Sequence, residues 1–144
     1  MLKPGDFSDT LRALGRFVEL VGAFEITIDD RGEDSFDVAW QCRDGRIERH
    51  LTHQDVDALR RSALFFRGTG SWSPVFGTAG FLRSVGREMD DRGAEGITVA
   101  ETLDGFWAAG TADGIGFELE FTYAELVERT QSFQRQHRMA AAIR

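Results

Sequence analysis

Four side chains in the first half of the chain have types and spacings that could do chemistry. His50 and His53 form an H-x-x-H pair with Asp55 close by, and histidines at such a spacing can bind a metal or exchange protons. The pair straddles the end of an expected strand and the start of an expected helix, and no second cluster of ligand residues completes a coordination set. We therefore expect no metal and no cofactor, and a surface or cap-adjacent role for both histidines.

Cys42 is the fourth of these side chains, and it is the only cysteine. A nucleophilic thiol needs a base and a group that orients the base. A hairpin turn at 43–45 could bring His50 or His53 towards Cys42, but no strained nucleophile turn surrounds the cysteine. We expect an inert or mildly reactive thiol, so an enzyme that uses His50, His53 and Cys42 is the alternative rather than the leading hypothesis.

The segments that should form the helices and strands around these residues occur as two similar copies in the sequence. Residues 11–28 and 82–99 are identical at eight of eighteen positions when aligned at an offset of 71, whereas ordinary residue usage gives roughly one identity in such a window. After the first expected strand the offset falls to 70, and Phe36/Phe106 is among the pairs that continue the match. Residues related by these two offsets are called matched positions below.

The repeat predicts a tandem duplication with a pseudo-two-fold arrangement, as in a fused homodimer. The expected parts are a first repeat at 1–67, a linker at 68–77 and a second repeat at 78–144, packed as one compact domain. Each repeat is predicted to be α-β-β-β-α, because helical periodicity gives way to three alternating segments and then returns. The fold class is therefore α+β, with antiparallel three-stranded meanders and flanking helices. How the two repeats pack is left open.

Local signals set the ends of the expected helices. The first helix is predicted over 8–21, with Gly22 and its match Gly93 as left-handed terminators. Thr52 and Thr122 each begin a capping box, and Thr78 is a candidate N-cap.

Matched residues inside the first helix of each repeat point to a helix crossing. Interior glycine costs about 1 kcal/mol relative to alanine, so the recurrence of Gly15 as Gly86 predicts a close backbone approach. Arginines recur at helical i, i+4 spacing and could clamp a carboxylate or a phosphate; we expect instead that they pair with Glu19, Asp90 or strand acids. These arginines are Arg12, Arg16, Arg83 and Arg87.

Arg49 and Trp107 depart from the patterns of their strands. Arg49 interrupts an apolar strand face where the matched residue is Leu119, and it is expected at a sheet edge with its stem packed and its head free. Trp107 falls on the outer face, where the matched residue is Asp37. It marks either a binding or self-association surface or a sheet that is covered on both faces.

Composition limits the function classes. The chain of 144 residues has a net charge of −7, so no DNA partner is expected and RNA is unlikely, although α-β-β-β-α coincides with the topology of double-stranded-RNA-binding domains. No apolar run is long enough for a membrane helix, and the start of the chain does not resemble a secretory signal. One cysteine suits a reducing cytoplasm.

The sequence does not establish a biochemical function. The leading hypothesis is a non-catalytic soluble module for protein interaction or small-ligand binding, with self-association possible. The candidate surface or ligand residues are Trp107, His50, His53, Cys42 and Arg49.

Overall fold

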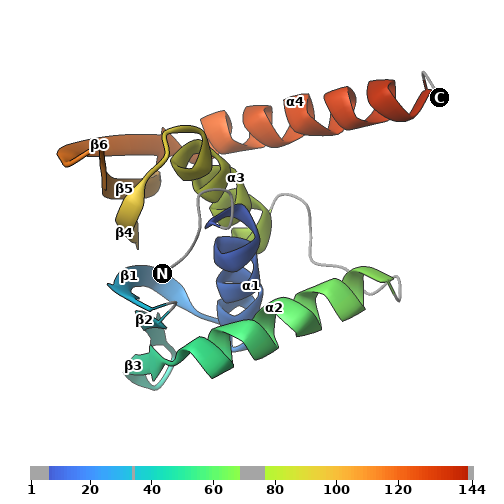
Figure 1. Cartoon of the computed structure of the whole chain (residues 1–144). Helices are drawn as coiled ribbons and strands as arrows, with labels where there is room; N and C mark the ends of the chain where they lie inside the picture. The colour runs from blue at the N-terminus through green and yellow to red at the C-terminus, as the bar shows by residue number, and fades with distance from the viewer. Residues whose placement is uncertain (1–6, 34, 69–76, 143–144) are drawn as a thin grey trace.

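The computed structural model describes residues 7–33, 35–68 and 77–142 (Figure 1). Almost all of the expected linker lies outside the described residues. The fold is α+β, and a helix, three strands and a helix follow one another twice. The elements are α1 (Phe7–Leu20), β1 (Phe24–Gly32), β2 (Ser35–Cys42), β3 (Gly45–Leu51), α2 (His53–Gly68), α3 (Thr78–Asp91), β4 (Glu95–Glu101), β5 (Gly105–Ala112), β6 (Ile115–Thr122) and α4 (Tyr123–Ala142).

All six strands form one antiparallel sheet in the order β3-β2-β1-β4-β5-β6. The two meanders are therefore joined edge to edge, by β1 and β4. At this join Ile28 lies opposite Val99, and these two residues are matched positions. Thr27 lies opposite Ala100 and Asp29 opposite Thr98, so the pairing runs symmetrically outward from the Ile28–Val99 pair.

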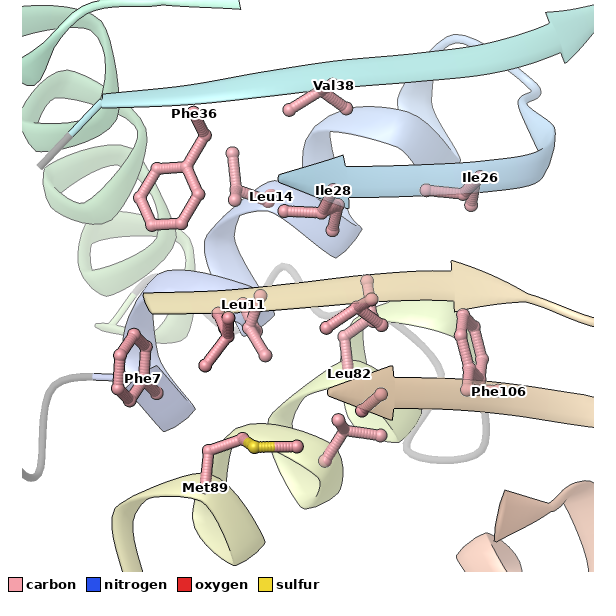
Figure 2. Packing of buried hydrophobic residues seen from close by; sticks show 14 of the residues in the cluster. Phe7, Leu11, Leu14, Ile26, Ile28, Phe36, Val38, Leu82, Met89 and Phe106 are labelled. Carbon is pink, nitrogen blue, oxygen red and sulfur yellow. The ribbon is translucent and has the colours of Figure 1, made fainter. Parts of the chain in front are cut away.

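The described helices lie on one side of the sheet (Figure 1). The helices α1 and α3 lie against its middle, while α2 and α4 lie nearer the outer strands and extend away from it. Alternating strand residues such as Ile28, Val38 and Val99 are buried against Leu11, Leu14 and Leu82 of the central helices. Figure 2 shows this layer, which holds the two halves together as a single core.

The central helices α1 and α3 cross at the two glycines, as the sequence predicts. A Cβ atom on Gly15 would lie 2.7 Å from the Cα of Ala79. A Cβ atom on Gly86 would lie 2.6 Å from the carbonyl oxygen of Phe7. Both distances are far below van der Waals contact, so the absence of a side chain is what permits the crossing.

The N-cap predicted at Thr78 is wrong, because α3 is capped from another helix. Gly77 occupies the N-cap position and makes no side-chain hydrogen bond. The backbone N–H of Ala79 instead donates to Glu19 Oε1 of α1 at 2.8 Å. In the reverse direction, the N–H groups of Phe7 and Ser8 donate to the two carboxylate oxygens of Asp90, at 2.9 and 3.1 Å.

The cap exchange between α1 and α3 uses matched acids, because Glu19 and Asp90 are related by the offset of 71. Each carboxylate accepts hydrogen bonds at the positive end of the opposite helix, where unpaired N–H groups favour negative charge. The crossing is therefore fastened at both ends by side chains that a local sequence window cannot relate to the caps.

The other predicted helix signals are confirmed. The N–H of Thr52 donates to Asp55 while the N–H of Asp55 donates to the Thr52 hydroxyl, a reciprocal capping box. The hydrogen bond from the Thr52 backbone N–H and a second one from the Thr52 hydroxyl to the same carboxylate oxygen, in that order, lower the pKa of the Asp55 carboxyl. At the second box the N–H of Glu125 donates to the Thr122 hydroxyl at 3.1 Å, and the return bond runs from that hydroxyl, rather than from the Thr122 N–H, to Glu125 Oε1. Gly22 and Gly93 have φ of 68° and 66°, the left-handed conformation expected of helix terminators.

Candidate functional site

The face of the sheet turned away from the helices is covered by no described element (Figure 1). We call it the open face. It consists of the strand side chains that alternate with the buried ones, arranged in two rows across the sheet by the strand register. One row is Glu48, Ala39, Thr27, Ala100, Trp107 and Glu120, and the other is His50, Asp37, Asp29, Thr98, Ala109 and Glu118.

Trp107 lies within the first row, between Ala100 of β4 and Glu120 of β6. Its ring is half-buried and Ala109 is the next residue of β5 on the same face. The sequence left two alternatives for this tryptophan. A sheet covered on both faces is not observed among the described residues, because their helices all lie on the other side (Figure 1). The large aromatic therefore stands on an uncovered part of the face, with the small residues Ala100 and Ala109 beside it.

The second row carries a connected set of polar side chains. One carboxylate oxygen of Asp37 lies 2.7 Å from His50 Nδ1, and the other accepts a hydrogen bond from Arg31 Nε at 3.1 Å. One strand further in, the hydroxyl of Thr98 donates to Asp29 Oδ1 at 2.6 Å. These bonds restrain the side chains of Asp29 and Asp37, which lie opposite each other on β1 and β2. Exposed ion pairs of this kind contribute little to stability.

A depression of about 390 Å³ lies where these polar residues meet the small residues of the first row. Its size falls within the range of ligand pockets in proteins, about 300–1,000 Å³. It is open to solvent on the side away from the helices. Its polar and charged lining residues are Thr27, Asp29, Asp37, Glu48, Arg49, His50 and Thr98, of which Arg49 belongs to a core-side position of β3.

The structure does not bring Cys42 and His50 together. The thiol of Cys42 lies at the closed end of the β2–β3 hairpin, where it donates to the carbonyl of Gly45 at 3.2 Å. His50 pairs with Asp37, five residues away along β2, which is about 17 Å at the rise of a strand. The two side chains also belong to opposite faces of the sheet, since Cys42 packs on the core side and His50 on the open face.

Arg49 and His53 are placed apart from the open face. Arg49 lies opposite Val38 on the edge strand β3, exposed, with Nη1 donating to the carbonyl of Glu48 at 2.9 Å. The predicted edge position is confirmed, but the predicted packed stem and free head are wrong, because the residue is exposed and its guanidinium is hydrogen-bonded. His53 is the first residue of α2 and is exposed. Of the five predicted site residues, only Trp107 and His50 belong to the open face.

The sequence analysis missed an exposed apolar cluster at one end of the sheet. Leu20, Val21 and Phe24 are 73%, 42% and 48% exposed, and Leu103 is 96% exposed. Because Thr27 pairs with Ala100, the start of β1 and the end of β4 lie at the same end of the sheet. We call these four residues the apolar end. Their matched residues at the other end are Asp91, Arg92, Glu95 and Glu33, and that exchange of apolar for charged side chains was the available signal.

The described residues contain neither a metal-binding cluster nor a membrane-spanning helix. No group of three or more histidine, cysteine or acidic side chains in 7–33, 35–68 and 77–142 could hold a metal ion. Within the same residues no helix has both the length and the apolar character that crossing a membrane requires.

Comparison with known proteins adds no relative, because no protein family, curated protein or solved structure matches the chain. The function must be argued from the geometry of the open face.

Proposed function

We propose that this chain is a non-catalytic protein-interaction module, and that it binds its partner with the open face of the sheet. The observation that carries the proposal is the position of Trp107. A half-buried tryptophan stands between Ala100 and Glu120 on a face that no described element covers. Tryptophan is enriched at the centres of protein interfaces, where its large area is desolvated on binding.

The polar residues favour binding over catalysis. A thiol enzyme needs its base within hydrogen-bond reach, whereas Cys42 and His50 belong to opposite faces of the sheet. The His50–Asp37 pair has an orienting carboxylate, but its hydrogen bonds and ion pairs within the described residues include no nucleophile. A small-ligand function is the second candidate, and the depression of about 390 Å³ beside this pair is the observation that favours it.

Tandem duplication belongs to the same proposal. The symmetric pairing about Ile28 and Val99 and the exchange of caps by Glu19 and Asp90 both relate matched positions. These features are what a fused homodimer with a pseudo-two-fold axis would retain. On this account the shared residues maintain the scaffold, and function was gained where the halves diverged. A cytoplasmic location, and the absence of DNA, RNA and membrane partners, are proposed with it on the grounds of composition.

The test substitutes Trp107→Asp and compares it with the wild type and with a control, Asp57→Asn on α2. Proteins bound by each are quantified from a lysate of the source organism, and any that depend on Trp107 are purified and bound again. The proposal expects a purified partner that binds the wild type and the control but not Trp107→Asp. If Trp107→Asp leaves every partner and the oligomeric state unchanged while it stays folded, the open face is not the interaction surface.

A further inference from the structure

The open face carries more carboxylates than guanidinium groups. Its rows carry five carboxylates, and two guanidinium groups lie on the same face. Both guanidinium groups are already engaged, Arg31 with Asp37 at 3.1 Å and Arg46 with the Thr27 hydroxyl at 3.5 Å. The face therefore presents a surplus of negative charge. Its five carboxylates are those of Asp29, Asp37, Glu48, Glu118 and Glu120.

Three of these carboxylates lie at the outer margins of the face. Glu48 is on the edge strand β3, and Glu118 and Glu120 are on the opposite edge strand β6. All three are exposed, and within the described part of the chain none has an ion-pair partner. Six strands spaced about 4.8 Å apart place these margins about 24 Å from each other. A small cation at one margin would not contact the other, whereas a peptide segment would reach both.

Between the margins, several of the side chains on the open face are small and apolar. Ala39, Ala100 and Ala109 stand on the inner strands, together with Trp107 and two threonines. Arginine and lysine have apolar stems that cover such a surface while their charged ends reach carboxylates. An arginine guanidinium also stacks on a tryptophan face. The arrangement of apolar floor and acidic margins is thus complementary to a basic segment.

We propose that the open face binds an arginine- or lysine-bearing segment of a partner protein, laid across the strands between Glu48 and Glu120. This inference rests on the proposed function and adds the chemistry of the partner. Complementary charge across an interface accelerates encounter and selects partners. A nucleic acid or an anionic membrane surface is disfavoured because the face repels negative charge.

The depression gives the segment one anchoring position. Asp29, Asp37 and Glu48 line it from three neighbouring strands. A guanidinium group entering there could donate to the carboxylates of Asp29 and Glu48, whereas both oxygens of Asp37 are already bound by His50 and Arg31. Thr98 and His50 hold Asp29 and Asp37 in place by the bonds described above, so a lysine or arginine inserted there meets acids that are already oriented.

The experiment uses the full chain and a labelled peptide, acetyl-(Arg-Ala)₄-amide, with acetyl-(Glu-Ala)₄-amide as the opposite-charge control. Fluorescence anisotropy measures the Kd at about 50 and 200 mM salt. The test variant is Glu48→Gln/Glu118→Gln/Glu120→Gln, which neutralises the margins. The matched control is Asp57→Asn/Asp91→Asn/Glu128→Gln, which changes the net charge equally on α2, α3 and α4. Circular dichroism verifies that both remain folded.

The expected result is that the arginine peptide binds and the glutamate peptide does not. The margin variant weakens binding about tenfold and the control variant much less, because each exposed charge contributes a fraction of a kcal/mol at its own site only. Equal losses in both variants would overturn the inference, since they would indicate attraction by net charge alone.

Failure of the inference and failure of the proposed function are distinguishable. If the arginine peptide does not bind but a purified partner still requires Trp107, the chemistry assigned to the partner is wrong and the interaction surface stands. If neither the peptide binds nor any partner depends on Trp107, both proposals are wrong.

Discussion

The two junctions between central helix and outer hairpin have opposite chemistry at matched positions. In the first half, Phe17 of α1 packs edge-on against Trp40, with ring centroids 5.5 Å apart. In the second half, Glu88 stands at the position of Phe17, and it binds Arg92 at 3.1 Å and Arg129 at 3.2 Å. The two arginines in turn lie over aromatic rings, Arg92 over Phe117 at 5.3 Å and Arg129 over Phe121 at 5.2 Å.

The difference between the junctions indicates which features the fold depends on. The same helix–sheet geometry is built once with an aromatic pair and once with an ion-pair network, so we expect the chemistry of the junction to be replaceable. The glycine crossing and the exchanged caps occur in both halves, so we expect the fold to require them. The following predictions test this contrast, beginning with the feature common to both halves.

The largest expected effect is at the crossing. Gly86→Ala places a Cβ within 2.7 Å of three backbone atoms at the start of α1, and overpacking of this kind destabilises by about 1–3 kcal/mol. Gly116→Ala is the control, because its Cβ would approach no atom closer than 4.0 Å. Urea unfolding of both variants measures the difference. Equal stability of the two would mean that the crossing relaxes freely.

The aromatic junction is expected to come next. Phe17→Ala removes the contact with Trp40 and part of the apolar layer, at a cost of about 2 kcal/mol for a half-buried ring. Because the interaction is apolar, the loss should be the same at low and high salt. Thermal unfolding at both salt concentrations tests this, and a salt-dependent loss would contradict the contrast between the halves.

The charged junction should be weaker and should depend on pH. Burial opposes ionisation of Glu88, but hydrogen bonds from Arg129 and Arg92 outweigh it and lower the pKa of the carboxyl. A lowered pKa in the folded state stabilises above the unfolded pKa, about 4.3, and that contribution is lost as pH falls below it. Glu88→Gln should cost about 1 kcal/mol near pH 7 and progressively less as pH falls through the folded-state pKa. A cost that does not decrease between pH 7 and pH 3 would exclude the ionic explanation.

Tyr123 gives the second half a further pH dependence that its matched residue, His53, cannot share. Burial and a 2.7 Å hydrogen bond to Glu101 raise the pKa of the Tyr123 phenol above its ordinary value. The folded state therefore retains the proton more strongly than the unfolded state, so stability should fall as pH rises above about 10. Tyr123→Phe should remove this alkaline decline at a cost of about 1 kcal/mol near neutral pH. An unchanged decline in the variant would assign it to other groups.

The smallest effect is expected at the apolar end. Leu20→Asp introduces the type of residue found at the matched position, Asp91, and Leu20 is 73% exposed. Unfolding free energy should change by about 0.5 kcal/mol or less, while binding of an apolar dye such as anilinonaphthalene sulfonate should decrease. A large destabilisation would show that the side chain supports the fold.

Repetition in the sequence was enough to predict the order of elements and several of their ends. Helix ends that depend only on local backbone geometry could be predicted from residue type alone. These are the glycine terminators Gly22 and Gly93 and the capping threonines Thr52 and Thr122. The crossing at Gly15 and Gly86 was also predictable, because an unfavourable residue recurred at a matched helical position.

The remaining features depend on contacts between distant parts of the chain. The cap on Ala79 comes from Glu19, sixty residues earlier, so the local search favoured Thr78 instead. The edge-to-edge pairing of β1 and β4 could not be told from stacking of two sheets, since both bury the same alternating face. A contact between Cys42 and His50 could not be excluded from the sequence, because it does not give the register of β2 and β3 or the sheet face on which each side chain lies.

The central claim is that the open face, rather than the apolar end, binds a basic segment of a partner protein. The most direct test is a titration of ¹⁵N-labelled protein with acetyl-(Arg-Ala)₄-amide, followed by amide chemical shifts. The account predicts that shifts concentrate on the strands at Thr27, Asp37, Ala39, Thr98 and Trp107, with saturation. Shifts centred on Leu20, Phe24 and Leu103, or spread over the helices, would contradict it.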